Sequence, residues 1–146
     1  MSEEQTITKE FYVKRLGELC LKSGLTGFPK NDLDQQILLK SAVLTIGRAG
    51  SFTESEINDK LETWVRQIAQ IKNVDRVTLR RRLVDSGYLT RAGDGSSYQV
   101  VQPGAHAELF DEAVDQVDPA EAIRMAREEI ERRKGEYLER SKGAKQ

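Results

Sequence analysis

The chain has 146 residues, a length that suits one domain with a helical extension. Its 23 Lys and Arg residues, set against 24 Asp and Glu residues, leave a net charge of −1. Dedicated nucleic-acid binders are usually basic, so this balance disfavours a protein that binds nucleic acid with its whole surface. A local basic patch can still supply the necessary field.

Cysteine content and the N-terminal sequence bear on the compartment. Cys20 is the only cysteine, which excludes an internal disulfide and fits a reducing cytosol. No apolar run approaches the roughly 18 residues that cross a bilayer. The acidic, polar start MSEEQTITKE is unlike a signal peptide. We therefore expect a cytoplasmic protein that does not enter a membrane.

The first two expected elements are helices. Residues 8–23 repeat apolar side chains at helical spacing, namely Tyr12, Val13, Leu16, Leu19 and Cys20. Gly24 is a suitable stop for this helix. A second helix is predicted over residues 31–46, because Asn31 or Asp32 can cap its start and Gly47 can close it.

The third helix has the clearest start signal in the chain. Thr53 and Glu56 have the spacing of a capping box, and Phe52 and Ile57 have the spacing of the matching hydrophobic staple. The apolar stripe then continues for four turns, through Ile57, Leu61, Trp64, Val65, Ile68 and Ile71. We expect Trp64 to pack in the core.

A fourth helix is predicted over about residues 75–86, and the period of the pattern then changes from helical to alternating. Strand-like runs at 88–91 and 97–101 enclose the Asp94-Gly95 dipeptide. Asp-Gly between two such runs is a strong signal for a β-hairpin.

Residues 103–146 differ in composition from the preceding part. The stretch 108–121 has six acidic residues and no Lys or Arg. Asp118 followed by Pro119 is typical of a helix start, and we expect that helix to reach about residue 140 and the tail beyond it to be disordered. A narrow apolar seam runs along the helix, formed by Ile123, Ala126, Ile130, Tyr137 and Leu138.

This order predicts a mainly α protein with one small β-hairpin. Helices that start near residues 31, 53 and 75, followed directly by a hairpin, are typical of a winged helix-turn-helix. The recognition helix would span 75–86 and the wing 88–101. We divide the chain into an N-terminal helix (1–27), a winged-helix domain (28–102) and an acidic linker with a C-terminal helix (103–146).

The fourth helix carries the predicted DNA-binding face. At 100° per residue, Leu79 and Leu83 point into the core, with Val77 and Val84 closing the far side of the buried arc. Arg76 and Arg80 lie over the core edge, where we expect Arg80 to extend toward solvent or pair with a carboxylate, and Arg81 and Arg82 on the opposite side are the first choice for DNA contacts. The expected DNA contacts are made by exposed polar side chains, namely Thr78, Arg81, Arg82, Arg91, Arg76 and Lys72.

Local charge supports this face, because residues 72–91 have six basic and two acidic side chains, a net charge of +4. An exposed helical face is, however, often charged without binding anything. We therefore keep two functional hypotheses. The first is a DNA-binding transcriptional regulator, and the second is a protein-interaction module built on a winged helix.

Two further alternatives concern the flanks. The acidic stretch 108–121 either docks on the basic fourth helix and masks it, or faces solvent. The seam of the C-terminal helix either pairs with a second copy of the chain or packs on its own domain. Helix 8–23 is the other surface that could form a homodimer.

We expect no catalysis, cofactor or metal. The single histidine, His106, and the single cysteine, Cys20, are far apart in the sequence and cannot make a standard zinc site. Cys20 lies on an apolar helix face, where a buried core role is the common one. The segment Gly93–Gly95 is too short for a phosphate-binding loop.

Residues 28–101 resemble a small bacterial family known only as a domain of unknown function. The matching motifs are Phe28-Pro29-Lys30, Phe52-Thr53-Glu54, Glu56-Ile57-Asn58, Thr78-Leu79-Arg80-Arg81, Leu83-Val84-Asp85, Gly87, Leu89, Arg91, Gly95 and Tyr98. Members occur alone or attached to winged-helix transcriptional regulators of the arsenic-repressor type. The resemblance implies a winged-helix-like fold and a regulatory role, without catalytic residues. The longer link before Thr78 and Gln99 after Tyr98 depart from the family pattern.

Overall fold

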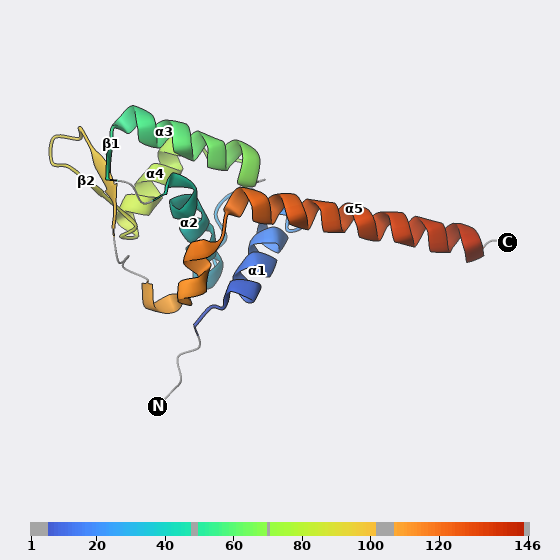
Figure 1. Cartoon of the computed structure of the whole chain (residues 1–146). Helices are drawn as coiled ribbons and strands as arrows, with labels where there is room; N and C mark the ends of the chain where they lie inside the picture. Colours follow the sequence, from blue (N-terminus) through green and yellow to red (C-terminus); the bar gives the residue numbers. More distant parts are fainter. Residues whose placement is uncertain (1–5, 48–49, 70, 102–106, 145–146) are drawn as a thin grey trace.

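The computed structural model of the chain describes residues 6–47, 50–69, 71–101 and 107–144 (Figure 1). The protein is mainly helical, with a small three-stranded antiparallel sheet. The principal helices in this part of the chain are α1 (Lys9–Leu21), α2 (Asp32–Ile46), α3 (Glu54–Thr63), α4 (Arg76–Asp85) and α5 (Pro119–Ala144). The strands are β1 (Ser51–Phe52), β2 (Leu89–Arg91) and β3 (Tyr98–Val100). None of the helices in the described ranges is long and apolar enough to span a bilayer.

Local side chains set the helix starts, as expected. The side chain of Asn31 accepts a hydrogen bond from the Asp34 backbone N–H at 3.0 Å and caps α2. At α3 both halves of the capping box form: the Glu56 N–H donates to the Thr53 hydroxyl oxygen at 3.1 Å, and the Thr53 N–H donates to the Glu56 carboxylate at 2.8 Å.

The end of the third helix differs from the prediction. The α-helix stops at Thr63 and is followed by a π-helical turn, η1 (Trp64–Ile68), in which the Ala69 N–H donates to the Trp64 carbonyl. Ala69 is then extended, so the expected four regular turns do not continue to Ile71. Ile71 is nevertheless buried, because it reaches the core from the turn that precedes α4.

The hairpin is confirmed, and it acquires a strand that the sequence pattern did not reveal. Strands β2 and β3 pair antiparallel, and β1 pairs with the other edge of β3, so the sheet order is β1-β3-β2. The residue pairs Ser51–Gln99 and Phe52–Tyr98 set the register of β1. A strand of two residues is too short to produce a detectable alternation.

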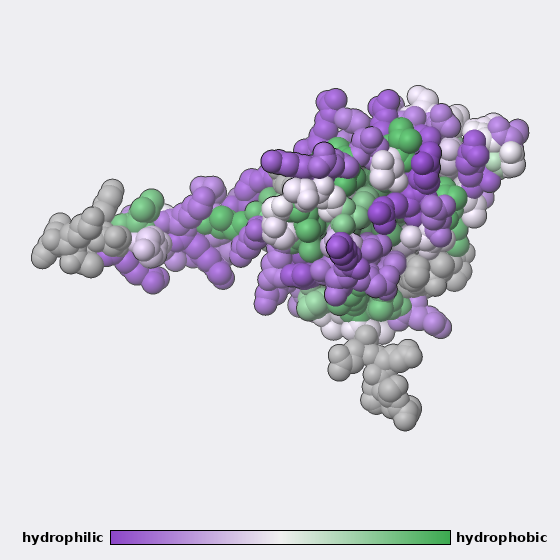
Figure 2. All heavy atoms as spheres, turned by 180° about the vertical axis from the view of Figure 1, so that it is seen from behind, coloured by the Kyte–Doolittle hydropathy of each residue, from purple (hydrophilic) through white to green (hydrophobic). Residues whose placement is uncertain are grey.

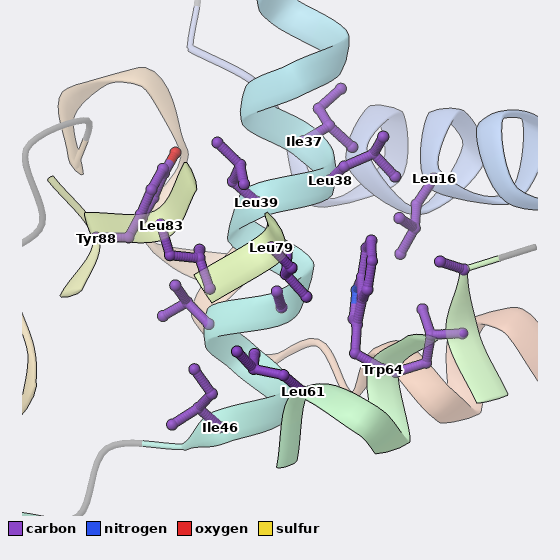
Figure 3. Close-up of a cluster of buried hydrophobic side chains, with 14 of the residues drawn as sticks. Leu16, Ile37, Leu38, Leu39, Ile46, Leu61, Trp64, Leu79, Leu83 and Tyr88 are labelled. Atoms are coloured by element: carbon purple, nitrogen blue, oxygen red, sulfur yellow. The ribbon is translucent and has the colours of Figure 1, made fainter. Parts of the chain in front are cut away.

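The core is built around α2. Figure 3 shows Leu79 and Leu83 of α4 near this helix, and Trp64 beside Leu16 of α1. Trp64 is fully buried, and its indole N–H donates to the Ser41 hydroxyl oxygen at 2.7 Å. This contact satisfies the polar end of a large apolar side chain. The expected core positions of Trp64 and Cys20 are confirmed.

The two flanks of the chain pack on the same core. Tyr12 of α1 meets Phe110 edge-on, with ring centroids 5.9 Å apart. The guanidinium group of Arg15 makes two hydrogen bonds of 2.9 Å to the Asp34 carboxylate and thereby joins α1 to α2. Ile123 near the start of α5 is 1% exposed and belongs to the same hydrophobic cluster.

The acidic stretch lies beside α1 and α2. It contains two short 3-10 helices, η2 (Ala107–Leu109) and η3 (Glu112–Gln116), and a backbone bridge joins Phe110 to Ile7. Asp115 pairs with Lys40 of α2 at 2.7 Å. All six acidic residues of the stretch are exposed, which agrees with the solvent-facing alternative, while its backbone packs on the α1–α2 side of the molecule.

Helix α5 starts as expected, with the Asp118 carboxylate accepting from the Ala120 N–H at 3.1 Å. It then continues to Ala144, so the prediction of a disordered tail is wrong for residues 141–144. Figure 1 shows this helix extending away from the body, with its C-terminal end opposite the β-hairpin.

Candidate nucleic-acid interface

Helix α4 presents two different faces. Leu79 and Leu83 are fully buried, while Arg81 and Arg82 are exposed, as the helical wheel predicted. The Asp75 carboxylate caps the helix by accepting the Thr78 backbone N–H at 2.8 Å. This bond and the Thr78 hydroxyl hold the pKa of Asp75 below its ordinary value. The capped helix therefore has a defined start from which the arginines project.

The predicted burial of Val77 is wrong. Its side chain is 44% exposed, whereas Val84 is half-buried. Val77 precedes Leu79 by two residues, a rotation of about 200°, so the two side chains point about 160° apart. A core centred on Leu79 and Leu83 therefore cannot also cover Val77. The outer face of α4 consequently has an apolar side chain among its polar ones.

Arg80 supports the interface from within. Its guanidinium group donates a short hydrogen bond to the Asn58 side-chain oxygen of α3 and lies 5.7 Å from the centroid of the Tyr98 ring. The Tyr98 hydroxyl in turn donates to Glu54 at 3.4 Å. These contacts connect α4, α3 and β3. Arg80 is at the core edge as predicted, but its partner is an amide and not a carboxylate.

Arg82 and Arg76 have partners on other elements. The Arg82 guanidinium lies 4.6 Å from the centroid of the Phe28 ring, a distance suited to cation–π stacking. Stacking on a ring leaves the N–H groups at the guanidinium edge able to donate. Arg76 lies 3.8 Å from the Glu62 carboxylate, and its side chain is 46% exposed.

The remaining predicted site residues surround α4. Lys72 is exposed in the turn before the helix, where its backbone N–H donates to the Leu25 carbonyl at 3.3 Å. Thr78 is exposed on the first turn, although its backbone N–H is used by the cap. All six predicted residues are thus on α4, the turn before it or β2, and their role in DNA binding stays a prediction.

Arg91 marks the hairpin. Its guanidinium lies over Gly95, so closely that a Cβ at Gly95 would be 2.5 Å from Nη2. Gly95 also has a φ of +76°, which favours glycine at this turn. The Asp94 carboxylate accepts from the Ser96 hydroxyl at 2.7 Å and from its backbone N–H at 2.9 Å, and these bonds hold the pKa of Asp94 below its ordinary value. The hairpin tip is therefore shaped by short-range contacts.

A groove of about 300 Å³ separates α4 from the hairpin. Its lining combines apolar and charged side chains, contributed by Val77, Arg80, Arg81, Val84, Asp85, Arg91 and Tyr98. Arginine side chains beside apolar ones can hold phosphate oxygens and contact base edges. Sequence reasoning missed Val77 in the lining of the groove, and it missed the contacts of Asn58 with Arg80 and of Phe28 with Arg82. A stricter reading of the helical wheel would have found Val77, whereas the other two needed the fold.

A metal centre has no support in the described part of the chain. No group of three or more His, Cys, Asp or Glu side chains there is arranged to hold a metal ion. Cys20 is buried in the core, and His106 is outside the described residues.

The features above define a mainly helical protein in which an arginine-bearing helix lies beside a β-hairpin. The chain belongs to the family described as an uncharacterized protein conserved in bacteria (DUF2087), whose model matches residues 24–100, slightly more than half of its length. The match covers α2 to β3 and confirms the resemblance to a bacterial domain of unknown function. No curated protein and no solved structure matches the chain. The likeness to winged-helix regulators stays a prediction.

Proposed function

We propose that the protein is a non-enzymatic, DNA-binding transcriptional regulator built on a winged helix-turn-helix. In this proposal α2, α3 and α4 are the three core helices, α4 enters the major groove, and the β2–β3 hairpin is the wing. The element order α2-β1-α3-α4-β2-β3 and the sheet order β1-β3-β2 support the assignment.

The outward face of α4 is the observation that carries the proposal. Among the described residues neither Arg81 nor Arg82 has an ion pair with a carboxylate, and both are exposed. Arg82 is oriented by Phe28 instead of by an acid. Two arginines that retain their full charge on the exposed face of a capped helix suit phosphate or guanine contacts.

The distribution of charge supports the same surface. Residues 72–91 have a net charge of +4, although the whole chain has a net charge of −1. Asp115 of the acidic stretch is paired with Lys40 on α2, and the six acidic residues of the stretch are exposed to solvent. A basic surface on an otherwise balanced protein favours one docking orientation on a polyanion.

Each site residue has a role in this proposal. Arg81 and Arg82 contact guanine edges or phosphates, and Thr78, Arg76 and Lys72 bind phosphates. Val77 is placed to contact a thymine methyl group, which would favour A·T pairs at one position of the target. Arg91 reaches the DNA backbone or a narrow minor groove from the wing.

A salt titration of duplex binding tests the proposal. Affinity should fall steeply with salt, because each neutralised phosphate contributes a slope of about −0.9 in log–log form. The double variant Arg81→Ala/Arg82→Ala should reduce the magnitude of the slope by about 2. The double variant Lys14→Ala/Arg127→Ala removes the same charge from exposed positions on α1 and α5 and should keep the slope. Absence of binding at about 50 mM salt would contradict the proposal.

A protein-interaction module is the second candidate function. The apolar lining of the groove favours it, because an exposed Val77 beside Val84 and Tyr98 also suits an apolar side chain of a protein partner. The titration separates the two classes, since a protein-binding groove has no reason to bind random duplex with a steep salt dependence. A second copy of the chain is a further proposed partner, through a surface distinct from α4.

A further inference from the structure

The C-terminal half of α5 forms an arm, which we define as residues 131–144. Figure 1 shows the arm extending beyond α1, and all ten residues from 131 to 140 are exposed. Tyr137 is 71% exposed and Leu138 is 57% exposed. Figure 2 shows the arm from behind, with apolar patches interrupting its mainly hydrophilic surface. Neighbouring large apolar side chains on an exposed helix indicate a surface for a partner.

These side chains continue the stripe with which α5 packs on α1. A Cβ on Gly17 of α1 would lie 3.2 Å from the Ala126 Cβ, so the two helices are close there. Helix α1 ends at Leu21, and a hollow of about 420 Å³ lies between that end and the stripe. Its lining residues are Lys22, Ile130, Arg133, Lys134, Tyr137 and Leu138.

The hollow has charges of one sign beside its apolar side chains. Its three charged lining residues are cationic, and no carboxylate is among the described residues that line it. Arg133 is bonded to Glu129 at 2.8 Å. Within the described part of the chain neither Lys22 nor Lys134 has an ion pair, and both are exposed. Two cations that retain their charge beside apolar side chains favour an occupant that is both acidic and apolar.

The lining has the spacing of a helix-binding surface. The α5 residues in it fall at positions 130, 133, 134, 137 and 138, the i, i+3, i+4, i+7 and i+8 pattern of one helical stripe. They span about 12 Å, which matches about two turns of a second helix. An amphipathic helix that docks on another protein uses anchors at this spacing.

A second copy of the chain supplies no matching segment among the described residues. The arm has five basic and three acidic residues, a net charge of +2, so a second arm would bring cations to a cationic site. The acidic stretch 108–121 has the opposite charge, but its large apolar side chains pack against its own core, namely Leu109, Phe110, Val114 and Val117. That stretch would bring carboxylates without an apolar side chain for Tyr137 and Leu138.

The shape of the site favours a protein segment over an anionic membrane. Helix α1 packs on the face of α5 that continues into the hollow, so a flat bilayer that approaches this face meets α1 first. A single helix is about 10 Å across and can enter beyond the end of α1 without this collision.

We propose that the hollow between the arm and the end of α1 binds an acidic amphipathic helix of another protein. Leucine or phenylalanine side chains of that helix contact Ile130, Tyr137 and Leu138, and its carboxylates pair with Lys22 and Lys134. The contact area is small, so the complex is transient. This site is distinct from α4, and the inference does not depend on DNA binding.

Fluorescence anisotropy of a labelled synthetic peptide with the full chain tests the proposal. The probe is a helix-forming peptide of about 15 residues, with leucine and phenylalanine on one face and glutamates beside them. It should bind with a dissociation constant of about 10–100 µM. A peptide with glutamine in place of each glutamate should bind at least about 10-fold more weakly. Absence of binding of the glutamate peptide at about 1 mM, or equal binding of both peptides, would overturn the proposal.

Charge reversal tests the two lysines. Lys22→Glu/Lys134→Glu should weaken binding of the glutamate peptide by at least about 10-fold, and it should bind a peptide with lysine in place of each glutamate better than wild type does. Lys9→Glu/Lys14→Glu is the matched control, because it reverses two exposed lysines of α1 outside the lining, and it should retain wild-type affinity. Equal losses in the two variants would assign binding to overall charge and overturn the proposal.

A substitution of the apolar stripe tests the other half of the site. Leu138→Gln should weaken binding by about 10-fold, since an apolar contact is lost. Met125→Gln is the matched control, because Met125 is 58% exposed on the same helix but outside the lining, and it should bind as wild type does. Far-UV circular dichroism checks the helix content of both variants. Unchanged binding by Leu138→Gln would contradict the proposal.

Two further measurements separate this site from α4 and from a lipid surface. Arg81→Ala/Arg82→Ala should bind the glutamate peptide as wild type does, whatever its effect on duplex DNA. A loss of peptide binding in that variant would place the peptide on α4 and overturn the inference. Cosedimentation with vesicles of phosphatidylglycerol and phosphatidylcholine should not depend on Leu138. Vesicle binding that is lost in Leu138→Gln would identify a lipid surface instead.

Discussion

Helix α4 and the arm of α5 are both rich in arginine, yet their arginines differ in what surrounds them. On α5, Arg132 donates to Glu129 and Glu136, both at 2.6 Å, so its partners lie one turn away on the same helix. On α4, Arg80 bonds to Asn58 of α3 and Arg82 stacks on Phe28, so the partners come from other elements. The charge of Arg132 is neutralised locally, whereas that of Arg81 and Arg82 stays available.

The pKa values of the glutamates on α5 reflect this local pairing. Hydrogen bonds from Arg132 and Arg133 hold the pKa of Glu129 below its ordinary value, and Arg124 has the same effect on the pKa of Glu121. These are pairs at i,i+3 and i,i+4 spacing, which stabilise an isolated helix. Such pairing explains how an exposed helix can extend from the body without tertiary cover. Helix α4 instead relies on its buried leucines.

The largest expected effect comes from truncating the same residue type in both helices. Leu79→Ala should lower the free energy of unfolding by about 2–5 kcal/mol, because Leu79 is fully buried and its removal leaves a cavity. Leu138→Ala on the arm, measured at low protein concentration where the chain is monomeric, should lower the free energy of unfolding by less than about 0.5 kcal/mol. Urea denaturation monitored by Trp64 fluorescence measures both. Equal losses would show that the arm is packed as firmly as α4.

The second expected effect compares the arginines directly. Arg81→Ala/Arg82→Ala should weaken duplex binding by about 10–100-fold at moderate salt, the loss expected for two phosphate or base contacts. Arg132→Ala/Arg133→Ala should change affinity by less than about 2-fold, because glutamates of α5 already neutralise these side chains. Fluorescence anisotropy with a labelled duplex provides the measurement. Similar losses for both variants would indicate non-selective charge attraction.

The third prediction concerns the ring beneath Arg82. Phe28→Ala should weaken duplex binding by about 2–5-fold, because a cation–π contact at an exposed site is worth about 0.5–1 kcal/mol. Phe28→Tyr keeps the ring and should retain wild-type affinity. Since Phe28 is half-buried, the thermal midpoint of each variant needs to be compared with wild type. An affinity unchanged in Phe28→Ala would remove the ring from the interface.

The smallest effect is the pH dependence of the arm. Because the folded-state pKa of Glu129 is below its ordinary value of 4.5, its stabilising contribution is complete above that value and is lost as the pH falls through the lower folded value. Circular dichroism at 222 nm should therefore show a small loss of helix on acidification. Glu129→Gln cannot titrate, so it should show a smaller acid-dependent change than wild type. An identical acid-dependent change in both proteins would assign it to other carboxylates.

Short-range features of this protein were predictable from the sequence. The capping box at Thr53 and Glu56, the cap at Asn31 and the hairpin around Asp94-Gly95 all form. Each depends on residues at most 11 positions apart, so a short stretch of sequence contains all the interacting groups. The same reasoning identified the buried Leu79 and the exposed Arg81.

Long-range features were not predictable in this way. The two-residue strand β1 exists only because β3 offers it an edge. The contact of Phe28 with Arg82 joins residues 54 positions apart, and that of Asn58 with Arg80 joins residues 22 positions apart. Their formation depends on how α2, α3 and α4 pack, which no local pattern specifies.

The sequence by itself determined where the helices and the hairpin begin, and that Leu79 and Leu83 of α4 would be buried, since caps, turns and periodicity act locally. Only the tertiary structure decided which arginines keep their charge for a partner. On α5 the neighbouring turns supply glutamates. On α4 the packing supplies Arg80 and Arg82 with an amide and two aromatic rings, which orient these guanidinium groups without neutralising them, and it places Arg76 near the Glu62 carboxylate. The tertiary structure also decided that the apolar stripe of α5 extends beyond the end of α1 and leaves Tyr137 exposed.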